Sequence, residues 1–312
     1  MALGELLERL GDLRDAAFEI CVVHGPTEDG TKAVLQKWKR RIKVAANPER
    51  NLSISRNIGI AMAAGDFVAF IDDDAFPSPQ WLSELAAAFG DPKVGGAGGV
   101  VMDHTGAKTQ YVFSSANRLG NTNSCHKMPV ESTPFSFEFP YLQGVNCAFR
   151  REALLSVGGF DEEFDFYLDE TDLCCRLIDA GWVVKQLPNA IVHHRSLPSA
   201  IRDEQKITHS RYSVLKNKLY FSLVNSPAHH QAEQAIQDMK VFVAGNEEDI
   251  RHHTESGQLP PGTLDAFHAD AARAWKVGLE RGMSGERRLM DPKLPRRLRW
   301  RFRKFPLPET RF

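Results

Sequence analysis

The sequence has no apolar stretch that approaches the roughly 18–20 residues needed for a membrane-spanning helix. Its first residues, MALGELLERLGDLRD, place acids inside the apolar pattern, whereas the core of a signal peptide is continuously apolar. We therefore expect neither export nor integral insertion into a membrane. The 312 residues, 42% hydrophobic and 25% charged with a formal net charge of −1, are instead typical of a folded globular chain.

Cysteine is also scarce, and the five cysteines form no C-x-x-C pair and no even-numbered disulfide framework. This usage fits a reducing, cytoplasmic compartment best. The near-zero net charge hides one asymmetric segment, residues 285–312, which carries ten Lys or Arg against three Asp or Glu. Its bases alternate with Leu, Trp and Phe, so the tail is expected to pack, to hang free, or to contact an anionic membrane peripherally. No nucleic-acid-binding module is recognisable, and no nucleic-acid partner is expected.

Helical and β-prone segments alternate over the first two-thirds of the chain. Apolar runs such as 67–71 and 94–102 are typical of strands covered on both faces. The pattern predicts an α/β domain over residues 1–200, with a mostly parallel central sheet flanked by helices. Residues 201–312 are expected to form a helical C-terminal extension that ends in the basic tail. The polar stretch 103–140 shows little periodicity, and a connection of that length is either functional or mobile.

Three consecutive carboxylates, Asp72, Asp73 and Asp74, follow the apolar segment 67–71. Ionised side chains at one end of a strand repel one another unless cations or hydrogen-bond donors compensate them. Ligands of open α/β sheets bind at the carboxyl ends of strands, and a divalent cation that bridges to phosphate oxygens is a natural compensator. The alternative is a solvated acidic turn.

A second acidic group, Asp169, Glu170 and Asp172, begins a helical segment. Acids in a first turn interact favourably with the helix dipole and can cap the helix. Three carboxylates within four residues exceed what capping requires, so a general base in this segment is the competing interpretation.

His193 and His194 end a β-prone run, and Arg56 and Asn57 open a helical segment. Alternation along a strand directs neighbouring side chains to opposite faces, so at most one of the two histidines is expected to share a site with Asp74. A guanidinium and backbone donors at a helix start are well placed for phosphate contacts. Each feature also has an ordinary structural interpretation.

In order and spacing these segments resemble the family 2 inverting glycosyltransferases, whose nucleotide-binding α/β domain has the GT-A fold. The similarity extends from about Glu19 to Ser199. Five segments carry it: an Asp- and Gly-containing turn (residues 23–31), an Arg-Asn helix (55–66), a D-x-D triplet (70–74), a segment that ends in Gly-Gly-Phe-Asp (144–161) and an acidic helix start (169–173).

The resemblance implies a role for each matching residue. Asp74 and His194 would hold Mg²⁺ or Mn²⁺ against the diphosphate of a nucleotide-sugar donor. Glu170 would be the general base that takes a proton from the hydroxyl of a glycan, polysaccharide or lipid-linked acceptor. The donor-binding positions would be Arg56, Asp72, Asp73 and Asn146.

The sequence departs from the family pattern in two places. The order Asp169-Glu170 reverses the usual Glu-Asp, so Asp169 is an alternative base. The family also begins with a strand before its first helix, and that strand has no counterpart here. Either the chain is truncated at its N-terminus or other residues fill the gap, and we expect weak nucleotide binding or poor folding.

Two rival interpretations stay open. A metal-assisted nucleotide-sugar hydrolase would use water as its acceptor, so no added acceptor would accelerate the release of nucleoside diphosphate. A catalytically impaired sugar-nucleotide-binding protein would bind the donor without turnover.

Overall fold

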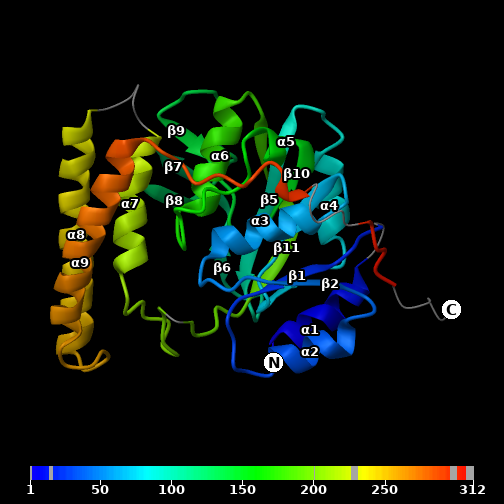
Figure 1. The fold of residues 1–312 in the computed structure, drawn as a ribbon, viewed down its shortest axis with the longest axis horizontal. Coiled ribbons are helices and arrows are strands. Elements are labelled where there is room, and N and C mark those ends of the chain that lie inside the picture. The colour runs from blue at the N-terminus through cyan, green and yellow to red at the C-terminus, as the bar shows by residue number, and fades with distance from the viewer. Residues whose placement is uncertain (1, 14–16, 200, 226–230, 296–300, 307–312) are drawn as a thin grey trace.

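The computed structural model describes residues 2–13, 17–199, 201–225, 231–295 and 301–306 (Figure 1). The helices are α1 (Ala2–Arg9), α2 (Thr31–Trp38), α3 (Leu52–Met62), α4 (Trp81–Ala88), α5 (Arg151–Ser156), α6 (Asp169–Asp179), α7 (Tyr212–Val224), α8 (Ala232–Glu255) and α9 (Thr263–Ser284), with a 3-10 turn η1 (Leu10–Asp12). The strands are β1 (Cys21–His24), β2 (Lys43–Ala46), β3 (Phe67–Phe70), β4 (Ala75–Pro77), β5 (Val94–Asp103), β6 (Thr109–Tyr111), β7 (Phe113–Asn117), β8 (Thr122–His126), β9 (Glu138–Pro140), β10 (Cys147–Arg150) and β11 (Val183–His194).

The central sheet has the strand order β3-β10-β5-β11-β4, and β6 pairs with β5. Strands β5 and β11 run parallel, but β10 is antiparallel to both of its neighbours and β4 is antiparallel to β11. The predicted α/β architecture is confirmed, whereas the expectation of a mostly parallel sheet is wrong for these pairs. A strand that is buried on both faces has the same continuous apolar pattern in either direction, so its sequence carries no signal for its orientation.

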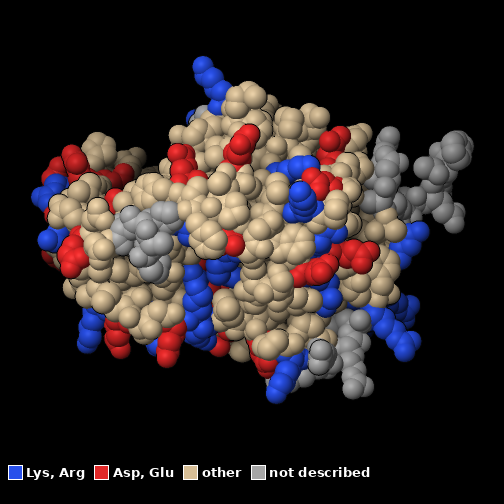
Figure 2. Space-filling view, turned by 90° about the horizontal axis from the view of Figure 1, so that it is seen from above, with Lys and Arg blue, Asp and Glu red and all other residues tan. Residues whose placement is uncertain are grey.

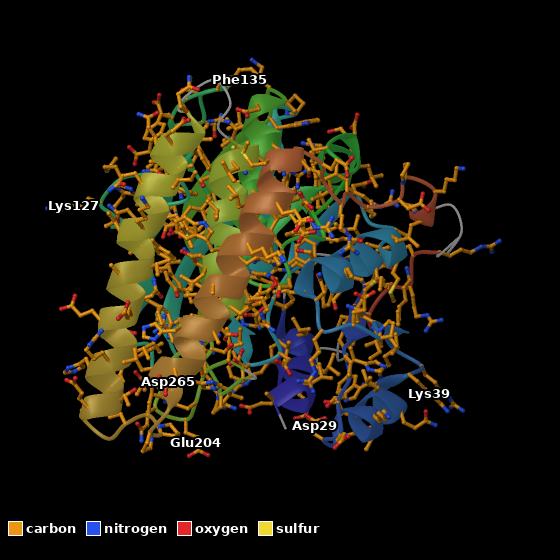
Figure 3. All side chains as sticks on the ribbon, turned by 60° about the vertical axis from the view of Figure 1, so that its left-hand side comes forward. Asp29, Lys39, Lys127, Phe135, Glu204 and Asp265 are labelled. Carbon is orange, nitrogen blue, oxygen red and sulfur yellow. The ribbon has the colours of Figure 1, made fainter. Side chains whose placement is uncertain are left out.

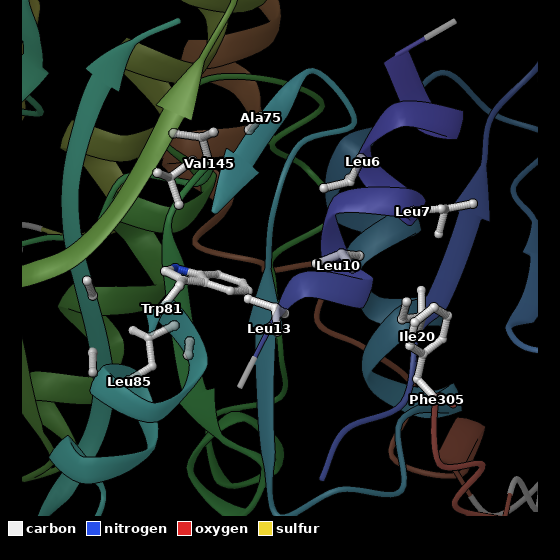
Figure 4. Close-up of a cluster of buried hydrophobic side chains, with 14 of the residues drawn as sticks. Leu6, Leu7, Leu10, Leu13, Ile20, Ala75, Trp81, Leu85, Val145 and Phe305 are labelled. Carbon is white, nitrogen blue, oxygen red and sulfur yellow. The ribbon is translucent and has the colours of Figure 1, made fainter. Parts of the chain in front are cut away.

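Strands β1 and β2 form a separate parallel pair, and no described strand links it to β3. Helix α1 lies between this pair and the central sheet (Figure 4). Its leucines share one buried cluster with Ile20, which precedes β1, and with Trp81 and Val145 on the other side. Helix α1 thus joins the β1–β2 pair to the central sheet through this cluster.

Residues 103–140, which show little periodicity, contain four strands. One of them, β6, extends the central sheet, and the other three form a small antiparallel sheet with the order β8-β7-β9. Strand β7 is buried at four consecutive positions, Phe113 to Ala116, so its sequence does not alternate between apolar and polar residues. This small sheet leads directly into Tyr141 and Gln143, which line a large cavity at the end of β3.

The helices α7, α8 and α9 pack together at one edge of the molecule, and Figure 3 shows α8 and α9 side by side. Their own apolar cluster includes Leu219, Met239 and Phe267, while Tyr220 and Phe221 of α7 face the core of the α/β part. The helical character of the C-terminal part is confirmed, although the first of its helices begins at Tyr212. The boundary expected at residue 200 stays a prediction, because that residue lies outside the described ranges.

The structure describes residues 285–295 and 301–306 of the basic tail. Residues 301–306 pack on the unit formed by β1, β2 and α2. Phe305 is 2% exposed and stacks between Phe18 and Trp38, with ring centroids 5.4 and 6.0 Å away. The Arg303 backbone N–H donates a hydrogen bond to Glu19. The neighbouring segments 296–300 and 307–312 lie outside the described residues.

Within the described ranges, no helix combines the length and the apolarity required to cross a bilayer. On the face seen in Figure 2, Lys and Arg are interspersed with Asp and Glu.

Candidate active site

A cavity of about 1210 Å³ lies where β3 ends, between β1, the start of α6 and the segment that follows β11. Seven of the eight predicted site residues line this cavity: Arg56, Asp72, Asp73, Asp74, Asp169, Glu170 and His194. The fold therefore brings together side chains that are up to about 140 positions apart in the sequence, as the open edge of an α/β sheet allows.

Asp72, Asp74 and His194 form a cluster in which three potential ligand atoms lie within 4.8 Å of one another. The antiparallel pairing of β4 with β11 places Ala75 opposite His194 and so brings the histidine to the end of the triplet. His194 Nε2 lies 3.3 Å from Asp74 Oδ1, and its Nδ1 lies 3.2 Å from Gln110 Oε1. With a cation bound, an Nδ1–H donated to Gln110 would leave the Nε2 lone pair free to ligate it, which is the usual second-shell arrangement of a metal-binding histidine. Without a cation, Nε2 is the nitrogen that donates to Asp74. Two carboxylates and one imidazole fit a divalent cation.

The three carboxylates of the triplet are compensated to different degrees. Burial raises the pKa of Asp72, and nearby positive charges offset this only in part. Burial and the two neighbouring carboxylates also raise the pKa of Asp73. Burial acts in the same direction on Asp74, but hydrogen bonds from His194 and from the Leu197 backbone N–H, at 2.7 Å, bring its pKa below the ordinary value. A cation beside Asp72 and Asp73 would supply the compensation that the protein does not.

Asp169 and Glu170 differ in how strongly Arg56 holds them. Asp169 is 1% exposed and forms a buried ion pair with Arg56, whose guanidinium also lies over the Phe160 ring. Burial raises the pKa of Asp169 well above its ordinary value, and the charge of Arg56 opposes that shift. Glu170 Oε2 lies 3.7 Å from Arg56 Nη1, and its side chain is 18% exposed. Glu170 is thus the carboxylate of this pair that remains accessible from the cavity.

The two residues before α6 adopt an unusual backbone conformation. Tyr167 and Leu168 have φ values of 73° and 66°, in the left-handed region that costs a non-glycine residue on the order of 1–3 kcal/mol. The buried Leu168 side chain holds this turn in place. The turn starts α6 at the cavity wall, so its first two residues, Asp169 and Glu170, face the triplet.

The third acidic residue of this helix start, Asp172, is not part of the site. It is fully buried and bonded to Arg176, Arg287 and Asn225, at 2.8, 2.7 and 2.9 Å. Three carboxylates within four residues therefore serve two different purposes, since only the first two reach the cavity.

One predicted donor-binding residue, Asn146, is placed elsewhere. Its side chain is fully buried, accepts a hydrogen bond from Trp81 Nε1 and donates to the carbonyls of Val100 and Ala190. With its oxygen and nitrogen both engaged, Asn146 ties β5 and β11 to helix α4, and it is not among the residues that line the cavity. The predicted donor contact of Asn146 stays a prediction, and the contacts that the structure shows for this side chain are structural.

The two histidines diverge as strand alternation predicts. His194 joins the acidic cluster, whereas His193 Nδ1 lies 3.3 Å from the carbonyl oxygen of Asp103, away from it. Other residues that line the cavity have no motif in the sequence. They include Ser124, Tyr141, Gln143, Arg202 and Arg211.

Comparison with known proteins places the chain among sugar transferases. Residues 2–158 match the family model described as "Glycosyl transferase family 2". A Pre-mycofactocin glycosyltransferase of Mycobacterium tuberculosis (strain ATCC 25618 / H37Rv) is 33% identical over 159 residues, which cover 49% of this chain and 32% of that protein. An N-acetylglucosaminyl-diphospho-decaprenol L-rhamnosyltransferase of the same strain is 28% identical over 211 residues, covering 58% of this chain and 67% of that protein. The match thus spans about a third of the length of the first relative and two-thirds of the second.

Solved structures show the same fold at low sequence identity. The mannosyltransferase PcManGT from Pyrobaculum calidifontis, solved with GDP-Man and Mn²⁺, has a TM-score of 0.52 and 17% identity, covering 91% of this chain and 81% of that one. TarS 1–349 of S. aureus has a TM-score of 0.50 and 15% identity, covering 91% and 88%. These neighbours confirm the predicted GT-A fold. Because the family model covers half of the chain, from residue 2 to residue 158, the chain belongs to glycosyl transferase family 2.

Proposed function

We propose that this protein is a metal-dependent inverting glycosyltransferase that moves a sugar from a nucleoside-diphosphate-sugar to a hydroxyl of a glycan, polysaccharide or lipid-linked acceptor. One observation carries the proposal: the cluster of Asp72, Asp74 and His194 lines the same cavity as Glu170. Two similar proteins support it, since the mannosyltransferase PcManGT was solved in complex with GDP-Man and Mn²⁺, and the rhamnosyltransferase relative is named for a diphospho-decaprenol.

On this proposal, Asp74 and His194 hold Mg²⁺ or Mn²⁺, with Asp72 and Asp73 beside the donor. When bound, such an ion neutralises the diphosphate and stabilises the departing nucleoside diphosphate. The raised pKa values of Asp72 and Asp73 support this assignment, because they mark carboxylates whose charge the protein alone leaves under-compensated. The charge of Arg56 also acts on this wall, because it opposes the rise in the pKa of Asp72.

Glu170 is the general base of the proposed reaction. Its carboxylate takes the proton of the acceptor hydroxyl while that oxygen attacks the anomeric carbon. The bond from the anomeric carbon to the diphosphate oxygen breaks on the opposite face, its electron pair leaves with the nucleoside diphosphate, and the configuration inverts. Asp169 is the positioning residue, since its pair with Arg56 fixes the start of α6.

Replacement of the base tests this assignment. In Glu170→Gln we expect transfer of radiolabelled sugar to fall roughly 10²- to 10⁴-fold, the usual contribution of general acid–base catalysis, with Mn²⁺-dependent nucleotide binding retained. Glu8→Gln is the matched control, because Glu8 is an exposed acid whose ion-pair partner among the described residues is Lys37, 3.8 Å away. Unchanged transfer by Glu170→Gln would remove Glu170 from the mechanism. Release of nucleoside diphosphate that no acceptor accelerates would favour the hydrolase instead.

A peripheral contact between the basic tail and anionic membrane stays a prediction. Phe305 and Arg303 are engaged with the protein, so the contact would depend on the exposed residues Arg301, Phe302 and Lys304. The double charge reversal Arg301→Glu with Lys304→Glu should weaken co-sedimentation with anionic liposomes. Equal sedimentation of the variant and the wild type would rule the contact out.

A further inference from the structure

The wall of the cavity beyond Glu170 is built by the small sheet β8-β7-β9 and the residues that follow it. Thr122 and Ser124 from β8, with Tyr141 and Gln143 after β9, line the cavity there. All four side chains are uncharged, and all four carry hydrogen-bonding groups. This wall therefore differs from the acidic wall around Asp72 and Asp74.

The polar groups of this wall hold one another in place. Gln143 Nε2 donates hydrogen bonds to Tyr141 Oη at 3.0 Å and to Ser114 Oγ at 3.1 Å, and it lies 3.4 Å from Ser124 Oγ. Ser124 Oγ and Tyr141 Oη are 3.0 Å apart. With its amide nitrogen engaged in this way, Gln143 is fixed in orientation. None of the described residues donates a hydrogen bond to Gln143 Oε1, so this oxygen is left as an acceptor on a residue that lines the cavity.

The network adjoins the proposed base. The backbone N–H of Gly144, the residue after Gln143, donates to Glu170 Oε1 at 3.4 Å. Burial raises the pKa of Tyr141, and the nearby negative charge of Glu170 adds to that shift. Tyr141 therefore stays a neutral phenol at physiological pH. The network and Glu170 therefore line one cavity, together with the acidic cluster.

We propose that Gln143, Tyr141 and Ser124 form the acceptor subsite and that they bind the ring of an uncharged sugar, whose reacting hydroxyl then lies at Glu170. This inference rests on the proposed function. A sugar hydroxyl both donates and accepts, so it complements a fixed amide oxygen and the two hydroxyls of this wall. A carboxylate or phosphate on the same ring would instead meet the Glu170 charge. None of the four side chains of this wall is a cation, and the nearby Arg56 is already paired with Asp169 and lies 3.7 Å from Glu170.

The main rival is an anionic acceptor held by arginine. Arg202 and Arg211 also line the cavity, from the segment between β11 and α7. Arg211 is paired with Asp249, whereas Arg202 forms no ion pair with any described residue, and its Nη2 donates to the carbonyl of Leu197. An acceptor that carries a phosphate next to the reacting sugar would depend on Arg202 rather than on Gln143.

Binding of simple glycosides separates these two possibilities without a known acceptor. We would record saturation-transfer NMR and calorimetric titrations with Mn²⁺ and UDP or GDP present. The probes are the methyl glycosides of glucose, galactose, mannose and N-acetylglucosamine, together with methyl glucuronide and glucose 1-phosphate. At least one neutral glycoside should bind, and Gln143→Leu and Tyr141→Phe should each weaken it by about tenfold, the effect of losing one or two hydrogen bonds.

The controls show whether a loss is specific to the subsite. Ser136→Ala removes a hydroxyl between β8 and β9 whose partners among the described residues are the carbonyls of Thr133 and Glu138, so it should leave glycoside affinity unchanged. Nucleotide affinity should stay within twofold in all these variants. Equal glycoside binding by the wild type and both subsite variants would overturn the inference, as would no binding by any neutral glycoside.

Preferential binding of the charged probes, lost in Arg202→Ala, would establish the anionic acceptor in place of the neutral sugar. Failure of the proposed function would look different, because the wild type would then show no Mn²⁺-dependent nucleotide binding at all.

Discussion

Two sets of carboxylates in this molecule differ in how their charge is balanced. Burial alone would raise the pKa of Asp172, but the charges of Arg176 and Arg287 outweigh it and lower the pKa to about 2. Asp72 and Asp73 show the reverse, because burial raises the pKa of each and no arginine bonds to either among the described residues. Aspartates of one protein thus shift in opposite directions.

The difference separates structural acids from those that we propose to be functional. Arg287 bonds to both Asp161 and Asp172, so the segment after α9 carries a permanent counter-ion into the core. The triplet at Asp72 lacks such a fixed counter-ion and lines a cavity that admits one from solution. Charge left under-compensated in a cavity is therefore the mark of the candidate site, rather than acidity as such.

Removal of a structural acid should have the largest effect on stability. We expect Asp172→Asn to lower the free energy of unfolding by about 3–5 kcal/mol, because Arg176 and Arg287 would lose a buried ionic partner. Urea denaturation followed by circular dichroism measures this change. Asp91→Asn is the control, since Asp91 is exposed and lies 3.6 Å from Lys185, and it should change the value by no more than about 0.5 kcal/mol. Equal effects in the two variants would show that Asp172 is not a structural acid.

Acidification should have a smaller effect through the same residue. The pKa of Asp172 is about 2 in the folded chain and about 3.9 in an unfolded one, so its stabilisation is present above pH of about 4 and is lost as the pH falls toward 2. The loss should be about 2 kcal/mol. Urea denaturation of the wild type and of Asp172→Asn at a series of pH values measures this loss. The difference between their free energies of unfolding should shrink as the pH falls toward 2. If the difference between the two free energies of unfolding does not change with pH, Asp172 is not ionised in the folded state.

Removal of a proposed functional acid should have the smallest effect on stability. It should raise the free energy of unfolding, whereas removal of Asp172 lowers it. In EDTA, Asp72→Asn should raise the free energy of unfolding by about 1 kcal/mol, because the variant no longer buries an under-compensated charge. It should also abolish the rise in melting temperature that Mn²⁺ gives the wild type. Thermal denaturation with EDTA and with Mn²⁺ measures both effects. Destabilisation in EDTA would place Asp72 with the structural acids.

The parts of the site that the sequence predicts are those encoded locally. The triplet Asp72–Asp74 follows an apolar strand directly, and His194 ends another, so strand position and alternation locate them. Which of Asp169, Glu170 and Asp172 line the cavity, and which is buried in ion pairs, is not encoded locally. It depends on Arg56 and Arg287, which come from distant segments of the chain.

Other features escape sequence reasoning for the same reason. Asn146 lies in a family-like segment, yet its partners Trp81 and Ala190 are fixed only by the packed sheet. The small sheet within residues 103–140 is hidden because β7 is buried on both faces and shows no alternation. Gln143 becomes notable only when its hydrogen-bond partners are known.

The most direct test of the central claim is a calorimetric titration of UDP and GDP into the wild type and into Asp74→Ala, each with Mn²⁺ and with EDTA. We predict that at least one nucleotide binds the wild type, with micromolar or weaker affinity, only when Mn²⁺ is present. Its affinity should fall at least about tenfold in Asp74→Ala, which removes a ligand from the cluster. Nucleotide binding that is the same in EDTA as in Mn²⁺ and unaffected by Asp74→Ala would contradict the assignment of a metal-dependent donor site.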